Sequence, residues 1–338
     1  MNELTLICPG LLGPVPTAAV RLPRVPTLDR LAARADWVES SAPSAAATLL
    51  RACGLRLDPD AEIPTAALSL LGEGHDEDPR GYWLHADPVH LRPDRERLLV
   101  FAGASLAPQR AEAEALVALF NAHFADEGLR LIAPHPERWY LHSERPLDLR
   151  AEPLASCIGR PIPLEMARGD DARRWSALMV ETQMLFHGAE VNRRREQTGR
   201  PSISGIWTWG GGPRPEPPGT PPDVLAGAGP LVAGLARWCG IARFAPDPWS
   251  LAPTAMSGRC VLFWDALERA LEARDIEAWT RALVTLDARL AELIAGPWRG
   301  RDAELHLDPC AGGLFQARRT SWRRFWRRGG LAERLHGI

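Results

Sequence analysis

Lysine is absent from this chain of 338 residues, and all 40 of its basic residues are arginine. Without lysine, the chain cannot form a Schiff base through a side-chain amine or place a P-loop lysine on nucleotide phosphates. The basic residues are matched by 42 acidic ones, which gives a formal net charge of −2. General nucleic-acid binders carry a basic excess that neutralises phosphates, so this balance argues against nucleic acid as a partner.

Long hydrophobic runs and paired cysteines are missing as well. No apolar stretch reaches the roughly 20 residues that a membrane-spanning helix needs, and no basic segment precedes the apolar residues near the N-terminus. The six cysteines are scattered and form no C-x-x-C pair, which argues against a structural zinc site. These absences predict a cytoplasmic protein with reduced thiols and no membrane partner.

Strand and helix patterns alternate at both ends of the chain, with a different unit between them. The acidic, turn-rich segment 72–81 marks a boundary, and the strands and single helix that follow it are typical of a small α+β unit. This order predicts an α/β fold with a mostly parallel sheet. Residues 1–80 and 202–338 would form the core, and residues 81–201 an inserted α+β cap domain.

Hydrophobic periodicity predicts the individual elements. Helices are expected over residues 26–32, 44–55, 108–127, 170–195, 224–240 and 275–295. Strands are expected over residues 4–8, 83–91, 97–102, 129–133, 139–142, 203–209, 261–264 and 304–307.

Several blocks resemble those of archaeal-type cofactor-independent phosphoglycerate mutases, which belong to the alkaline phosphatase superfamily. Two of them are Asn192-x-x-Arg195-x-x-x-Gly199 and the run Ile206-Trp207-Thr208-Trp209-Gly210-Gly211-Gly212. Residues 26–32, 68–72 and 234–240 resemble further superfamily segments. The resemblance implies a core of alkaline-phosphatase or phosphoglycerate-mutase type.

A closer resemblance is to a bacterial family known as RpfE-type regulatory proteins. Residues 82–91, residues 135–141 and the terminal block 322–327 are similar to segments of that family. These blocks are spread over nearly the whole chain, so the resemblance implies a regulatory protein on a phosphoglycerate-mutase-like scaffold.

The chemistry of the parent superfamily is not matched. Its members use two metal ions held by Asp and His, and a Ser that attacks phosphorus, because a dianionic phosphate repels a nucleophile until its charge is neutralised. The resemblance places the first metal-ligating Asp at Pro9, the Ser at Ile63 and the next Asp at Pro64. No histidine occurs in 265–274 or directly after Asp308. We therefore expect no catalytic residue, no metal and no cofactor.

His85 and Asp87 are the first candidates for ligand binding. On a strand they share one face, whereas His90 points to the other. A structural role or contact with a ligand is the favoured interpretation, and a metal set with His90 is the alternative.

A second group of candidates follows in the mutase-like blocks. Trp207 and Trp209 share a strand face, and they either pack in the core or line a pocket at the carboxyl end of the strand. The glycines Gly210, Gly211 and Gly212 would let backbone N–H groups approach a phosphate or carboxylate. Asn192 and Arg195 either satisfy a helix C-terminus or, through Arg195, grip an anionic ligand.

The favoured hypothesis is a catalytically silent protein with a regulatory or small-anion-binding role. Its pocket would lie between cap and core, lined by Asn192, Arg195 and the residues 207–212. One alternative is a phosphoglycerate-mutase-like or phosphatase-like enzyme with an altered site, in which His85, Asp87 and Asp308 cluster at the sheet's carboxyl edge. Another is a protein-interaction role for the Arg/Trp-rich tail Arg318–Arg328, which would dock on an acidic partner or on the protein's own acidic face.

Overall fold

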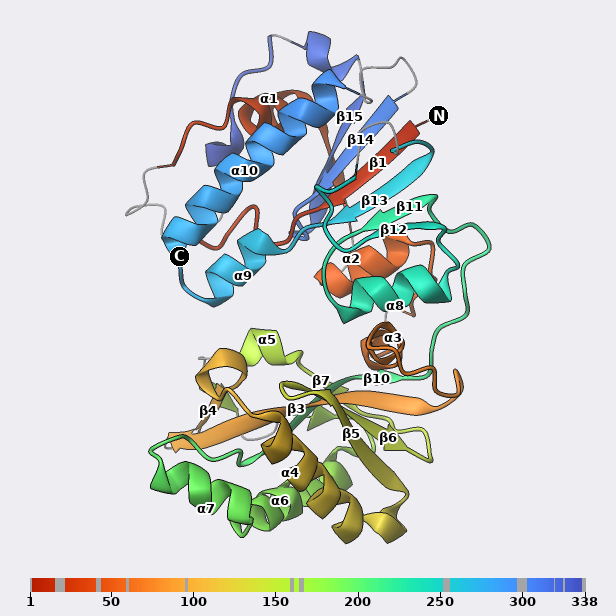
Figure 1. Cartoon of the computed structure of the whole chain (residues 1–338). Coiled ribbons are helices and arrows are strands. Elements are labelled where there is room, and N and C mark those ends of the chain that lie inside the picture. The colour runs from red at the N-terminus through yellow and green to blue at the C-terminus, as the bar shows by residue number, and fades with distance from the viewer. Residues whose placement is uncertain are drawn as a thin grey trace. The chain divides into compact units, whose positions relative to one another are not determined.

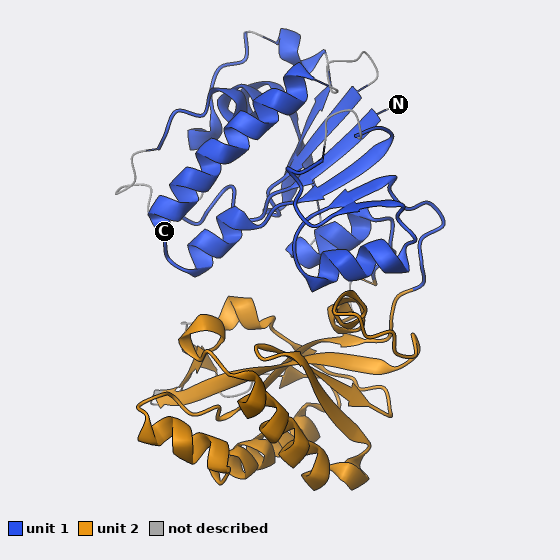
Figure 2. Cartoon of the chain, in the orientation of Figure 1, with its two compact units in different colours: residues 1–57, 216–338 blue, residues 58–215 orange. Residues whose placement is uncertain are grey.

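The chain is described here by a computed structural model that divides it into two compact units (Figure 2). The first unit comprises residues 1–57 and 216–338, and the second comprises residues 58–215. The structure describes residues 2–15, 22–40, 44–58, 61–94, 97–158, 161–163, 167–251, 256–296, 303–318, 320–324 and 326–335.

The first unit is built on a seven-stranded sheet with the order β12-β11-β13-β1-β14-β15-β2 (Figure 1). The strands from β12 to β14 in this order are parallel to one another. At one edge of the sheet, β15 pairs antiparallel with β14, and β2 pairs antiparallel with β15. The strands are β1 (Asn2–Ile7), β2 (Asp36–Glu39), β11 (Val224–Ala226), β12 (Arg243–Ala245), β13 (Arg259–Phe263), β14 (Ala303–Asp308) and β15 (Gly313–Arg318). The expected α/β fold with a mostly parallel sheet is therefore confirmed.

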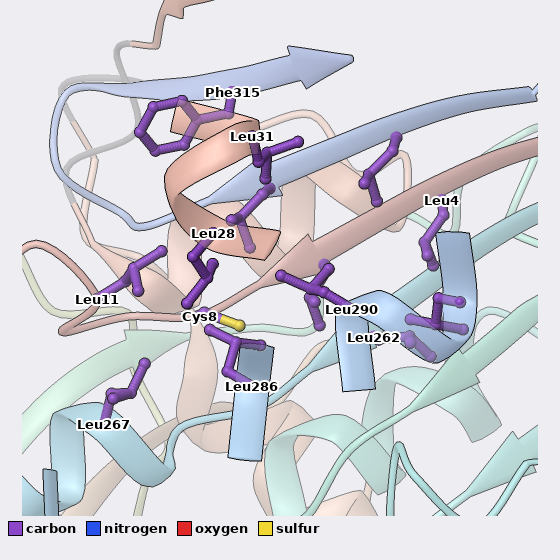
Figure 3. Close-up of a cluster of buried hydrophobic side chains, with 14 of the residues drawn as sticks. Leu4, Cys8, Leu11, Leu28, Leu31, Leu262, Leu267, Leu286, Leu290 and Phe315 are labelled. Carbon is purple, nitrogen blue, oxygen red and sulfur yellow. The ribbon is translucent and has the colours of Figure 1, made fainter. Parts of the chain in front are cut away.

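The main core of this unit lies between the sheet and two helices, α1 and α10 (Figure 3). Leu4 and Leu6 of β1 alternate toward it, as strand geometry requires. Asp287 of α10 accepts from the backbone N–H groups of Thr27 and Leu28 at 2.8 and 2.7 Å, so a buried carboxylate caps α1. The helices of the unit are α1 (Pro26–Arg34), α2 (Ala45–Ala52), α8 (Pro230–Trp238), α9 (Ala266–Glu272) and α10 (Ile276–Ala295).

The second unit has its own sheet, in the order β5-β6-β3-β4-β8, with β10 paired to β3. Leu84 and Ile206 belong to the face covered by α4 and α6, whereas Trp83 and Tyr140 pack with α3 on the opposite face. Its strands are β3 (Tyr82–Asp94), β4 (Arg97–Phe101), β5 (Leu129–His135), β6 (Arg138–Ser143), β7 (Arg150–Ala151), β8 (Pro161–Pro163), β9 (Ala167–Arg168) and β10 (Gly205–Gly212). Its helices are α3 (Thr65–Gly72), α4 (Arg110–His123), α5 (Leu154–Cys157), α6 (Ala172–His187) and α7 (Glu190–Gln197).

Three expectations differ from the observed elements. The helix expected over 170–195 is interrupted at Gly188 and continues as a separate helix, α7. The helix expected over 224–240 begins only at Pro230, because 224–226 form the buried strand β11. The strand β10, expected in the core domain, pairs antiparallel with β3 and so belongs to the sheet of the second unit.

Candidate functional site

A row of polar and aromatic side chains crosses three strands on the α3 face of the second sheet. Trp209 of β10 lies opposite His85 of β3, which lies opposite Tyr140 of β6. The imidazole of His85 stacks on Trp209 with ring centroids 4.0 Å apart and an interplanar angle of 13°, and the Tyr140 ring is 5.2 Å away. Strand pairing therefore fixes the order of these three rings.

His85 and Asp87 are both buried on this face, and burial favours the neutral form of each. It lowers the pKa of His85 to about 3. It raises the pKa of Asp87 to about 7, against the lowering effect of hydrogen bonds from Trp209 and Trp139. The indole Nε1 of Trp209 donates to Asp87 Oδ2 at 3.0 Å, and the backbone N–H of Trp139 to Oδ1 at 3.4 Å. Between about pH 3 and pH 7 the site therefore holds two neutral titratable groups.

Three buried polar atoms in this region have no hydrogen-bond partner among the described residues: Thr65 Oγ1, His85 Nε2 and Tyr140 Oη. Their residues are at most 6% exposed, so bulk water does not serve as a partner. Leaving a buried polar atom unpaired costs about 1–3 kcal/mol, and most such atoms in proteins are paired. An internal water or a ligand placed here would therefore gain hydrogen bonds from these three atoms.

The glycines after Trp209 bring the chain against the start of α3. A β-carbon on Gly210 would collide with Thr65 Oγ1 and lie 3.1 Å from His85 Cδ2, and Gly210 has a φ of +62°. A β-carbon on Gly212 would lie 2.8 Å from Pro64 Cβ. Glycine is thus required here for close packing under α3. The backbone N–H of Gly210 donates to Glu62 Oε1 at 2.8 Å, so a carboxylate of the chain already uses it.

Asn192 and Arg195 are buried in structural networks near the other end of β10. Asn192 Nδ2 donates to the carbonyls of Phe186 and Ile203, both at 2.8 Å, so it satisfies the end of α6 as one interpretation expected. Asn192 is the third residue of α7, however, and not part of a helix C-terminus.

The Arg195 guanidinium is fully enclosed by protein acceptors. It donates to the carbonyls of Pro201 and Leu106 and to Glu112 Oε2. Ile203, which Asn192 contacts, is six residues from Trp209, a separation of about 20 Å along an extended chain. The fold thus brings His85, Asp87, Trp209 and Gly210 together, but not Asn192 and Arg195 with them.

The remaining candidates lie apart from this cluster. Trp207 is on the same strand face as Trp209, and its indole N–H donates to Glu152 O at 2.9 Å within an apolar cluster. His90 Nδ1 lies 2.9 Å from Ser202 O, away from His85. Asp308 ends β14 in the sheet of the first unit, so it does not share a sheet edge with His85 and Asp87.

Glu62, Thr65 and Tyr140 were not singled out by the sequence. A signal existed for Thr65, a hydroxyl residue at the first position of α3, where N–H groups are unsatisfied. None existed for Glu62, because its partner Gly210 is 148 positions away.

The Arg/Trp-rich tail contacts Asp36, an acidic side chain of the first unit. Arg324 Nη1 and Arg327 Nη1 lie 2.5 and 3.2 Å from Asp36 Oδ1. Trp326 between them is 65% exposed. Docking of the tail on the protein's own acidic face is thus seen for these two arginines, and a protein partner stays a prediction.

Comparison with known proteins finds a similarity to one class of enzyme. No family model matches it. Over 71 residues, the chain is 37% identical to a 2,3-bisphosphoglycerate-independent phosphoglycerate mutase of Methanothrix thermoacetophila. The chain resembles the cofactor-independent phosphoglycerate mutases. The matched stretch is 21% of this chain and spans only 18% of the relative's length.

Two solved structures are similar over most of the chain. PH0037 protein from Pyrococcus horikoshii matches with a TM-score of 0.54 and 14% identity, covering 98% of this chain and 91% of that one. A cofactor-independent phosphoglycerate mutase from Thermoplasma acidophilum matches with a TM-score of 0.46 and 16% identity, covering 94% and 90%. At these identities, the likeness to PH0037 shows a shared fold.

The residues at the positions that the resemblance assigns do not fit a centre of two metal ions. Pro9, two residues beyond the end of β1, has no ligating side-chain atom, and Ile63 and Pro64 stand directly before α3. Among the residues that the structure describes, no three His, Cys, Asp or Glu side chains are grouped so as to hold a metal ion. Asp308 is retained, but its Oδ1 accepts from the backbone N–H of Cys310 at 2.7 Å.

Within the described ranges, no helix is long and apolar enough to cross a membrane.

Proposed function

We propose that this chain is a catalytically silent, phosphoglycerate-mutase-like protein that acts in regulation by binding a small anion. The observation that carries the proposal is the replacement of the expected Asp, Ser and Asp by Pro9, Ile63 and Pro64. The side chains of proline and isoleucine neither ligate a metal nor attack phosphorus. The two requirements of the superfamily chemistry, bound metal ions and a nucleophile, are therefore not met at these positions. The resemblance of residues 82–91 and 135–141 to RpfE-type regulatory proteins supports a regulatory, cytoplasmic role.

The second unit supports the binding half of the proposal. Its buried cluster of Thr65, His85 and Tyr140 offers hydrogen-bonding atoms that no other described residue pairs. Gly210 brings a backbone N–H to the same place. Pre-formed groups of this kind fix a ligand's orientation in most small-molecule sites.

A turnover assay tests the proposal. Purified protein, supplied with manganese and 3-phosphoglycerate, should form no 2-phosphoglycerate above a heat-inactivated sample. A matched variant, Ile63→Ser with Pro64→Asp, restores the nucleophile block while leaving Pro9 in place, and it should remain inactive because a metal ligand is still missing. Metal-dependent turnover by the unmodified protein would refute the proposal.

A further inference from the structure

A carboxylate from the chain itself occupies a backbone donor of β10. Glu62, three residues before α3, accepts from the N–H of Gly210 at 2.8 Å. Backbone N–H groups directed at a carboxylate are among the groups with which proteins hold anions. Glu62 therefore stands where an anionic ligand would be held.

The surroundings are built to receive such a group. Thr65 Oγ1 and His85 Nε2 have no partner within the part of the chain that the structure describes, and both side chains lie against the position that a β-carbon on Gly210 would take. Both residues are more than nine-tenths buried, so bulk water does not complete their hydrogen bonds. A ligand held by Gly210 would thus meet two further hydrogen-bonding side chains.

The surroundings of Glu62 disfavour its ionised form. Burial raises the pKa of Glu62, and the backbone N–H of Gly210 opposes this. The charge of Glu152 raises the pKa further, whereas that of Arg150 lowers it. A bound carboxylate would meet the same burial, but it would also reach Thr65 and His85, whose polar atoms Glu62 leaves without a hydrogen bond.

We propose that Glu62 is an internal occupant of an anion site, and that a small carboxylate ligand binds by displacing it from the N–H of Gly210. The occupant is itself a planar carboxylate, which sets the size and charge of the group that this place accepts. A phosphate dianion would bring a second negative charge into surroundings whose burial already disfavours one, and Arg150 supplies a single positive charge nearby. The inference rests on the proposed function, since it names the ligand class and the regulation of that site.

Chemical rescue of the whole chain tests the inference. Glu62→Ala frees the N–H of Gly210, and thermal unfolding is then followed while sodium acetate is titrated against sodium chloride of equal ionic strength. The variant should melt below the wild type and be restabilised by acetate, with an affinity about tenfold tighter than that of the wild type, a difference of about 1.4 kcal/mol. Glu114→Ala, which removes an exposed carboxylate on α4, is the control and should respond as the wild type does.

Two further arms complete the test. Glu62→Gln keeps the acceptor for Gly210 but not the charge, so its acetate affinity should fall between those of the wild type and the alanine variant. If the alanine variant does not fold, the glutamine variant is compared with the wild type in its place. Equal acetate responses in all variants would overturn the inference, and a larger shift with inorganic phosphate would overturn the carboxylate class. Metal-dependent turnover would refute the proposed function without changing the acetate result, so the two failures are distinguishable.

Discussion

His85 and Asp87 should give the fold two opposite dependences on pH that nearly cancel. The folded protein keeps His85 neutral down to about pH 3, whereas the unfolded chain protonates it below its ordinary pKa of 6.5. Stability contributed by this group is therefore lost as the pH falls below 6.5. Asp87 stays neutral in the fold up to about pH 7 but ionises in the unfolded chain above 3.8, so its contribution is lost as the pH rises through this range.

Each contribution changes by about 1.4 kcal/mol per pH unit between pH 5 and 6.5, which is about 2 kcal/mol over the interval. Asp87→Asn removes the contribution that is lost as the pH rises. The unfolding free energy of this variant should therefore gain about 2 kcal/mol relative to the wild type from pH 5 to pH 6.5. His85→Gln removes the contribution that grows as the pH rises, so its unfolding free energy should lose about as much relative to the wild type. Differences from the wild type cancel the titration of all other groups.

Urea unfolding at pH 5, 5.5, 6 and 6.5 measures these differences. Ser176→Ala, at an exposed position of α6 without a titratable group, is the control and should run parallel to the wild type. The reasoning is refuted if both site variants also run parallel to the wild type, since neither group would then differ in protonation between the folded and unfolded states over this range.

Three further predictions concern packing and buried partners. Gly210→Ala should cost about 1–3 kcal/mol, because its β-carbon meets Thr65 at a left-handed φ, whereas Gly219→Ala, in open space, should change the urea midpoint little. Asp287→Ala should lower the unfolding free energy by about 1–3 kcal/mol, because it leaves two N–H groups at the start of α1 unpaired. Asp287→Asn keeps an acceptor oxygen and should lower it less, so equal losses in thermal melts would contradict the capping role. Arg195→Met should cost about 3–5 kcal/mol by stranding buried acceptors, and a near-neutral result in urea unfolding would contradict the buried network.

Strand periodicity predicted the part of the candidate site that lies within one element. His85 and Asp87, two residues apart on β3, are buried on one face, and Trp207 and the partly buried Trp209 likewise share a face of β10. These relations follow from the alternation of side chains along a strand. The mostly parallel sheet of the first unit followed in the same way from the alternation of strand and helix patterns.

Long-range pairing accounts for what the sequence did not reveal. Gly210 was expected to offer its N–H to a ligand, but a chain segment 148 residues earlier supplies Glu62 as the acceptor. The helix break at Gly188 was missed because apolar spacing continues across it, and the break exists because Asn192 ties the end of α6 to Ile203. Such contacts depend on the tertiary arrangement, which local propensity does not encode.

Metal content tests the central claim most directly. Protein purified without chelators, dialysed against manganese or zinc and then against metal-free buffer, can be measured by inductively coupled plasma mass spectrometry. A chain with Pro9, Ile63 and Pro64 at the ligand and nucleophile positions should retain far less than one equivalent of either metal. Retention of about two equivalents per chain, as a dinuclear centre requires, would contradict the account.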